Sequence, residues 1–332
     1  MADQSRPAAA RADKILPGIW RLRLPLPWDA TPHGNAYAVE AGDGIVLFDT
    51  GYGGSDGLPQ LEVALRLAGW RLDDVKKVVC THAHSDHYGA AASIVERIGC
   101  PLWIHPAWEH VKPAAIDYER AIDQRLELAR HHGFPEEVVT EMERMRRGGE
   151  SGFDGTPAPA RDLVDGVEIE TGLGTWITHE TPGHAPSHVV FHQPDRQILL
   201  SGDQIVGRVF LYFDAGHTPD PVGEFSSSLD LVESLDVGLC LSGHGKPFRD
   251  VRAKVAANRA QVSEELDRMR SALAGGEPRT IFEAISSISG SEPPPVAFLG
   301  YLMEMSIAYL THLELLGEVE REEGEPRRWR LS

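Results

Sequence analysis

Short apolar segments separated by turn residues fill the first third of the chain. Alternation of apolar and polar residues predicts half-buried strands, and unbroken apolar runs predict strands buried on both faces. By these criteria strands are expected at 19–24, 35–40, 45–48, 75–80 and 102–104, and helices at 58–68 and 89–98. This order of elements indicates a β-α-β arrangement.

Residues 108–147 interrupt that arrangement. They are polar and charged with helical spacing, and the sequence Gly133-Phe134-Pro135 predicts a break between two helices. We interpret residues 106–150 as a helical insertion. Further strands are expected at 167–169, 176–180, 189–192, 198–200 and 237–241. Two β-rich halves of similar size suggest an α/β protein in which two sheets face each other, with helices outside.

The C-terminal part follows a third pattern. Amphipathic helices are expected at 251–273, 281–286 and 296–316, and the segments 318–320 and 328–331 form a predicted hairpin. Helices followed by a terminal hairpin resemble a winged helix. We therefore predict a disordered tail at 1–14, a main domain at 15–250 and a small winged-helix-like domain at 251–332.

Composition narrows the range of functions. The net charge of −18 disfavours a nucleic-acid partner, because phosphate neutralisation dominates that kind of binding. We see no apolar stretch of the roughly 18 to 20 residues that a membrane span needs, and no signal peptide. We therefore expect no membrane partner and a cytoplasmic location. Cys80, Cys100 and Cys240 lack CxxC spacing and are predicted to be buried free thiols.

The candidate chemistry is concentrated in the run Thr81-His82-Ala83-His84-Ser85-Asp86-His87, which follows a predicted buried strand. His82 and His84 are two residues apart, so an extended segment points both side chains to one side. Asp86 and His87 follow where the chain turns into a helix and can point at a second position. Imidazole and carboxylate groups suit a cation such as Zn²⁺, and four of them exceed the needs of one ion. A solvated polar loop is the alternative, and the buried strand leading into the run argues against it.

This run resembles the HxHxDH signature of the metallo-β-lactamase superfamily. The resemblance extends over residues 15–250 and includes His184, Asp203 and His244, each beside a glycine at the end of a predicted strand. It implies a four-layer αβ/βα sandwich and two metal ions. Zinc is the expected metal, with iron or manganese as alternatives. In the family pattern one ion is held by His82, His84 and His184, the other by Asp86, His87 and His244, and Asp203 bridges the two.

The implied reaction is hydrolysis. Two divalent ions would lower the pKa of a shared water from about 15.7 to about 7, giving a bridging hydroxide that attacks a carbonyl or phosphoryl centre. Asp86 and Asp203 are the predicted catalytic residues, because either can pass the proton to the leaving group.

Asp49 matches a family position that hydrogen-bonds a ligand histidine. Further candidates for the pocket or its support are His33, Tyr88, His188 and Tyr212, with an ordinary structural role as the alternative. The remaining histidines are interpreted as surface or structural residues: His105, His110, His131, His132, His179, His192, His217 and His312.

The substrate is less well determined, because one dinuclear site can serve several bond types. The C-terminal pattern is similar to a β-lactamase-like subgroup that contains an endoribonuclease and several thioesterases. Our leading hypothesis is hydrolysis of an ester, thioester or lactone of a small or medium acyl compound. A nuclease or phosphodiesterase is the alternative, supported by Arg327, Arg328 and Arg330 and opposed by the net charge. An iron-dependent redox enzyme and a non-catalytic scaffold are further alternatives. A homodimer through the insertion or the C-terminal helices stays open.

Overall fold

Two β-sheets form the centre of the computed structural model, which describes residues 9–28, 30–290 and 294–332. The first sheet runs in the order β1 to β7: β1 (Arg11–Leu16), β2 (Ile19–Trp28), β3 (Thr31–Ala41), β4 (Gly44–Phe48), β5 (Val75–Val79), β6 (Leu102–Ile104) and β7 (Arg161–Asp162). The second runs in the order β12 to β8: β8 (Glu168–Thr171), β9 (Gly174–Glu180), β10 (Val189–Gln193), β11 (Ile198–Gly202) and β12 (Leu239–Ser242). In the first sheet β4, β5 and β6 are parallel, so their carboxyl ends share one edge.

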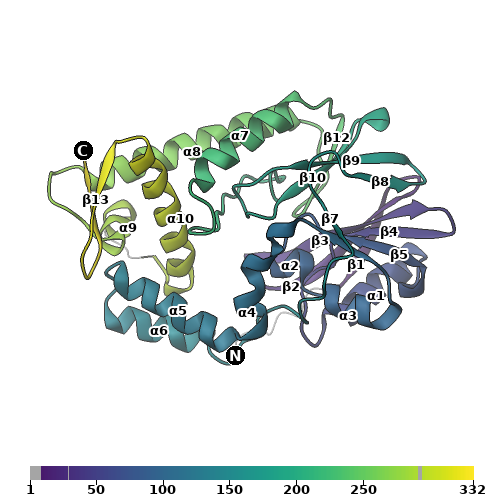
Figure 1. Cartoon of the computed structure of the whole chain (residues 1–332), viewed down its shortest axis with the longest axis horizontal. Coiled ribbons are helices and arrows are strands. Elements are labelled where there is room, and N and C mark those ends of the chain that lie inside the picture. Colours follow the sequence, from purple (N-terminus) through teal and green to yellow (C-terminus); the bar gives the residue numbers. More distant parts are fainter. Residues whose placement is uncertain (1–8, 29, 291–293) are drawn as a thin grey trace, which may run out of the picture.

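The two sheets pack face to face through an apolar layer. The Phe48 ring of the first sheet lies 5.5 Å from Trp176 and 5.2 Å from Phe191 of the second, measured between ring centroids. Helices α1 (Gly57–Ala68) and α3 (Ala91–Ile98) bury their apolar residues on the outer face of the first sheet. Helices α7 (Pro221–Ser234) and α8 (Val251–Leu273) cover the second sheet in the same way. The predicted four-layer sandwich is therefore confirmed (Figure 1).

The predicted helical insertion is also present. It consists of η2 (Pro106–Val111), α4 (Lys112–Ile116), α5 (Tyr118–His131) and α6 (Glu136–Arg146). The chain turns between α5 and α6 at the predicted break, where Gly133 has a φ of 83°. Both α5 and α6 lie beside α10 (Val296–Leu315), which belongs to the C-terminal segment (Figure 1).

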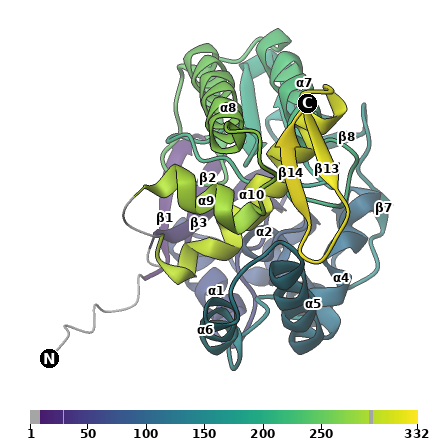
Figure 2. The ribbon, with the colours of Figure 1, turned by 90° about the vertical axis from the view of Figure 1, so that its left-hand side faces the viewer.

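The C-terminal segment contains α9 (Ile281–Ser289), α10 and the predicted hairpin of β13 (Val319–Glu322) and β14 (Arg328–Leu331). The hairpin lies next to the end of α5, where the Arg327 amide donates to the His131 carbonyl at 2.8 Å (Figure 2). Phe134 of the insertion and Phe282 of α9 pack with ring centroids 5.1 Å apart. One continuous apolar cluster thus joins the insertion, the second sheet and the C-terminal helices. The proposed boundary at residue 250 stays a prediction.

Two sequence-based expectations need correction. Strand β1 pairs with β2 from Arg11 onward, so residues 11–14 belong to the sheet and not to a tail, while residues 1–8 lie outside the described part. Helix α10 is long and apolar enough to cross a membrane by length and composition, although no such stretch was expected. Half of that apolar window is buried against neighbouring helices, as in a core helix. The three cysteines are free and buried, as predicted.

Candidate metal centre

Seven candidate ligands from both sheets converge at one end of the sandwich. The run that follows β5 leads into the short helix α2 (Ser85–Tyr88) and supplies four of them. The other three come from the loop between β9 and β10, from the end of β11 and from the end of β12. The structure therefore brings together His82, His84, Asp86, His87, His184, Asp203 and His244, as the sequence predicts.

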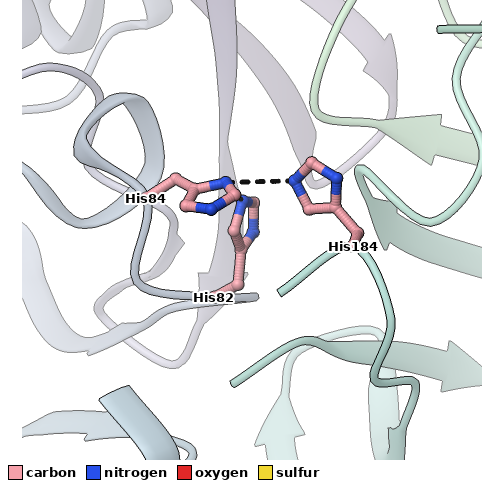
Figure 3. A group of neighbouring side chains, drawn as sticks. All are labelled: His82, His84 and His184. Carbon is pink, nitrogen blue, oxygen red and sulfur yellow. Dashed lines mark hydrogen bonds between the residues drawn. The ribbon is translucent and has the colours of Figure 1, made fainter. Parts of the chain in front are cut away.

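The first group of donors consists of three imidazoles. His84 Nδ1 lies 3.0 Å from His82 Nε2 and 3.0 Å from His184 Nε2. Figure 3 shows the three rings turned toward one another, with His82 and His84 on one segment and His184 on the opposite one. His84 thus presents Nδ1 to the group, whereas the other two present Nε2.

The second group combines imidazoles and carboxylates. His244 Nε2 lies 3.1 Å from Asp86 Oδ2 and 3.2 Å from Asp203 Oδ2. His87 Nε2 lies 3.6 Å from Asp86 Oδ2 and 3.5 Å from Asp203 Oδ1. Asp203 Oδ2 is also 3.8 Å from His184 Nε2, so this carboxylate stands between the two groups.

These separations fit divalent metal ions. Four tetrahedral ligands at about 2.0 to 2.1 Å from a metal lie about 3.3 Å from one another, which falls within the observed range. Among the described residues, buried His87 Nε2 and Asp203 Oδ1 have no hydrogen-bond partner, and an unpartnered buried polar atom is costly unless something binds it. The donor chemistry and these two atoms indicate that the residues present can hold metal ions.

The candidate ligand histidines differ in how firmly they hold protons. At His84 burial lowers the pKa, but Asp214 outweighs burial and raises it. Burial lowers the pKa of His184 to about 4 and lowers that of His82 as well, so both are neutral and ready to donate a lone pair at pH 7. At His244, burial lowers the pKa, but Asp203 and Asp86 have the larger effect and raise it to about 10. A metal must displace a proton from His244, so binding there is coupled to proton release.

Two predicted supporting residues hold the ligands in place. Asp49 Oδ2 accepts a hydrogen bond from His87 Nδ1 at 2.9 Å, and Asp49 Oδ1 accepts the Thr81 amide at 2.7 Å. Asp49 adopts a φ of 61°, a strained conformation for a residue other than glycine. His188 Nε2 accepts the backbone N–H of Asp203 at 3.0 Å. Both residues therefore orient donors without standing among them.

A third support was missed by the sequence analysis. Asp214 Oδ2 lies 2.8 Å from His84 Nε2, so the carboxylate fixes the ring that presents Nδ1 to the first group. His110 Nε2 lies 3.2 Å from the same oxygen, and its side chain is buried. The interpretation of His110 as a surface or structural residue is thus corrected, because it lines the site. No motif marks either residue, since Asp214 is 130 positions from His84 in the chain.

The remaining candidates have different positions. His33 contributes its backbone carbonyl, which accepts from His244 Nδ1 at 3.2 Å. The Tyr212 ring lies 5.6 Å from that of His84, and its carbonyl accepts from His184 Nδ1 at 3.0 Å. Tyr88 packs in the apolar cluster with Trp108 and Phe153, apart from the donors. The structure therefore places His33 and Tyr212 beside the centre and Tyr88 in the core.

Comparison with known proteins decides the family. The model of the metallo-beta-lactamase superfamily matches residues 31–244, which include all seven candidate ligands. The chain belongs to this superfamily. Membership and the donor clusters together show a metallo-hydrolase with a candidate divalent metal site.

Relatives and solved structures agree with this assignment. The chain is 27% identical over 245 residues to the "Probable metallo-hydrolase YqjP" of Bacillus subtilis (strain 168), covering 70% of this chain and 73% of the relative. It is 26% identical over 144 residues to the atrochrysone carboxyl ACP thioesterase of Aspergillus chevalieri, covering 41% and 45% respectively. A metallo-beta-lactamase family protein from Thermus thermophilus has a TM-score of 0.80 and 26% identity, covering 96% of this chain and 100% of that one. The structural match thus includes the C-terminal segment.

Proposed function

We propose that this chain is a dinuclear zinc hydrolase that cleaves an ester, thioester or lactone bond. The observation that carries the proposal is the position of Asp203 between two groups of donors, because one shared carboxylate suits two neighbouring ions. When bound, two divalent ions supply Lewis-acid chemistry and a water of lowered pKa. Two zinc ions, in preference to iron or manganese, follow from the imidazole-rich donor set.

The chain's own carboxylates would move the proton. Burial raises the pKa of Asp86, but His87 and His244 outweigh it and lower that pKa to about 2. Asp203 is held in its ionised form for the same reason, with His244 as its strongest partner. Both side chains are therefore ionised at neutral pH, as metal ligands must be, and either would hold a proton only transiently before passing it to a leaving group.

A cavity that the rings of Tyr212 and Tyr301 separate from His84 supports an acyl substrate. Tyr301 of α10 stacks on Tyr212, with 6.1 Å between the ring centroids, and so continues the wall of the metal centre. On its other side Tyr301 lines a cavity of about 270 Å³ together with Phe210, Leu302 and Met305. Such a surface suits the apolar part of an acyl compound. The similarity to a thioesterase also supports an acyl substrate.

The nuclease alternative loses its main support. Each of the three arginines of the terminal hairpin region has a carboxylate partner: Arg327 with Glu323 at 3.0 Å, Arg328 with Glu283 at 3.1 Å and Arg330 with Glu320 at 2.7 Å. A side chain already paired within the protein attracts a nucleic-acid phosphate less strongly. Together with the net charge of −18, this favours a small substrate. The cytoplasmic location and a homodimer stay predictions.

Metal analysis and a substrate panel test the proposal. We expect close to two zinc ions per chain and turnover of at least one ester, thioester or lactone, while bis-p-nitrophenyl phosphate is hydrolysed poorly. Asp203→Ala should lose metal and activity and keep its circular dichroism spectrum, because it removes the carboxylate shared by both donor groups. Asp195→Ala, on an exposed turn, is the matched control. One iron per chain, or phosphodiesters as the best substrates, would refute the proposal.

A further inference from the structure

Two arginines of the helical insertion face α10 at a point beside the metal centre. Arg125 lies on α5 and Arg146 on α6, two helices beside α10 (Figure 1). Both side chains approach Gly300 of α10. A β-carbon at residue 300 would lie 2.9 Å from Arg146 Nη2 and 3.5 Å from Arg125 Nε. The absence of a side chain at Gly300 therefore makes room for two guanidinium groups.

Of the two cations, Arg125 pairs with a carboxylate. Arg125 Nη2 lies 3.2 Å from Glu304 Oε1 and donates to the Gly300 carbonyl, while its buried Nε has no partner. Within the described part of the chain, the Arg146 guanidinium forms no hydrogen bond and has no carboxylate within 4.0 Å. Burial and the neighbouring Arg125 lower the pKa of Arg146. A partly buried cation beside a like charge is stabilised when an anion binds it.

Nearby arginines on the same helix are fully paired. Arg147 contacts Glu119, Asp123 and Glu143, and Arg144 binds Glu141. The surface of this acidic protein thus offers many carboxylates to arginine. Arg146 instead reaches Gly300 of α10, where it meets none of the carboxylates in the described part of the chain. Its lack of a partner is a property of its position and not of a local shortage of acids.

This pair of arginines is close to the reactive centre. Arg125 donates to the Gly300 carbonyl, and the next residue of α10, Tyr301, stacks on the Tyr212 ring with 6.1 Å between the centroids. Burial lowers the pKa of Arg125, but the carboxylates of Glu304 and Asp214 help to raise it above its usual value. Tyr212 borders His84, and Asp214 binds the same ring directly. The rings of Tyr301 and Tyr212 therefore connect the Gly300 position, which both arginines approach, with the candidate ligand His84.

We propose that Arg146, assisted by Arg125, binds a carboxylate of the substrate at the end remote from the bond that is cleaved. Guanidinium groups bind carboxylates through paired, directional hydrogen bonds, which would fix both the position and the orientation of that end. The inference rests on the proposed hydrolase function and narrows its substrates to acyl compounds that carry a free carboxylate.

Binding of paired small acids tests the subsite. Succinate, glutarate and adipate are compared with butyrate, pentanoate and hexanoate by isothermal titration calorimetry on the metal-loaded protein. Each pair shares one carboxylate that can reach the metals, so the difference reports the second carboxylate. We expect one dicarboxylate to bind about tenfold more tightly than its monocarboxylate, as for one charged hydrogen-bonded contact. Arg146→Gln should abolish this preference, and Arg146→Lys should restore part of it.

Arg144→Gln is the control, because it removes an exposed arginine from the same helix. Arg146→Gln is preferred to an Arg125 variant, which would leave Glu304 buried without its partner. A second measurement compares KM for p-nitrophenyl hydrogen glutarate and p-nitrophenyl pentanoate. Equal binding of all matched acids, or an Arg146→Gln variant that weakens both members of a pair alike, would overturn the subsite. Arg146-dependent binding without hydrolysis of any ester would instead uphold the subsite and refute the proposed function.

Discussion

Each histidine of the centre has two ring nitrogens, and the partner of the second nitrogen decides which one faces the metals. His87 Nδ1 donates a hydrogen bond to Asp49, so Nε2 points toward the second donor group. His84 does the reverse, because Asp214 binds its Nε2 and leaves Nδ1 for the first group. Carboxylates therefore set the tautomer and the direction of His84 and His87, while backbone carbonyls of Tyr212 and His33 do so for His184 and His244.

Replacing Asp214 should weaken the first donor group. In Asp214→Asn the His84 ring loses a charged hydrogen-bond partner, and we expect metal affinity to fall by about 10- to 100-fold. Competition with a fluorescent zinc chelator measures this change. Asp195→Asn on the exposed turn should leave the affinity unaltered. Equal affinity in both variants would show that Asp214 does not orient the ring.

Buried His132 should make the free energy of unfolding depend on pH. Burial, helped by the charges of His131 and Arg327, lowers the pKa of His132 from 6.5 to about 4. The folded state thus binds this proton less readily than the unfolded state does, so stability is complete above pH 6.5 and is lost as pH falls toward 4. The loss amounts to about 3 kcal/mol at most.

Urea unfolding at pH 7 and pH 4.5 checks the sign and size of this effect. The change in unfolding free energy between the two pH values should be smaller in His132→Gln than in the wild type. A variant that loses as much stability as the wild type would exclude His132 as a cause. Both proteins should be free of metal, so that proton release from the ligands does not contribute.

At the scale of elements, the centre depends on strand ends that come very close together. Gly243 follows β12, and its amide donates to the Gly202 carbonyl at the end of β11 at 2.8 Å. A β-carbon at residue 243 would collide with Asp203 Oδ1 and His87 Cε1. Glycine is therefore required here for the strands to deliver their ligands to one point.

Gly243→Ala should reduce metal content and activity without unfolding the chain, because the collision displaces only the ends of the ligand loops. Elemental analysis and circular dichroism measure the two properties. Gly207→Ala, where a β-carbon meets nothing closer than 3.5 Å, is the control and should resemble the wild type. Full metal loading of Gly243→Ala would show that the loops can move apart at little cost.

At the scale of the whole molecule, the C-terminal segment completes a core that the rest of the chain leaves open. Phe213 packs against Tyr309 of α10 with ring centroids 5.8 Å apart, and Phe134 packs against Phe282. Apolar residues of α7 lie in the same cluster. Removing the segment would expose all of these surfaces to water.

A chain that ends at residue 250 should therefore not fold cooperatively. We expect a broad thermal transition and strong binding of an apolar fluorescent dye, because large aromatic side chains lose their cover. Leu331→Ala, which changes an exposed residue of the last strand, should unfold like the wild type. A truncated chain with a sharp transition would instead support the predicted domain boundary at residue 250.

Local sequence patterns predicted the sheets, the insertion, the terminal hairpin and the four candidate ligands of the run at 82–87, and the family resemblance added His184, Asp203 and His244. They could do so because strand and helix periodicities are local, and because ligands at glycine-flanked strand ends stand beside recognisable turns. The tail was predicted incorrectly over residues 11–14, since pairing of β1 with β2 depends on a partner strand and not on the pattern of β1 itself.

Tertiary structure alone decided which side chains support the centre and where the side chain of Arg146 lies. Asp214 reaches His84 across 130 residues, and Arg146 meets Gly300 through the packing of α6 on α10. Neither contact leaves a periodic or motif signal, because burial of distant surfaces against each other creates it. The sequence thus determined the donors and their order along the chain, whereas packing determined their orientation and the charge that a substrate meets beside them.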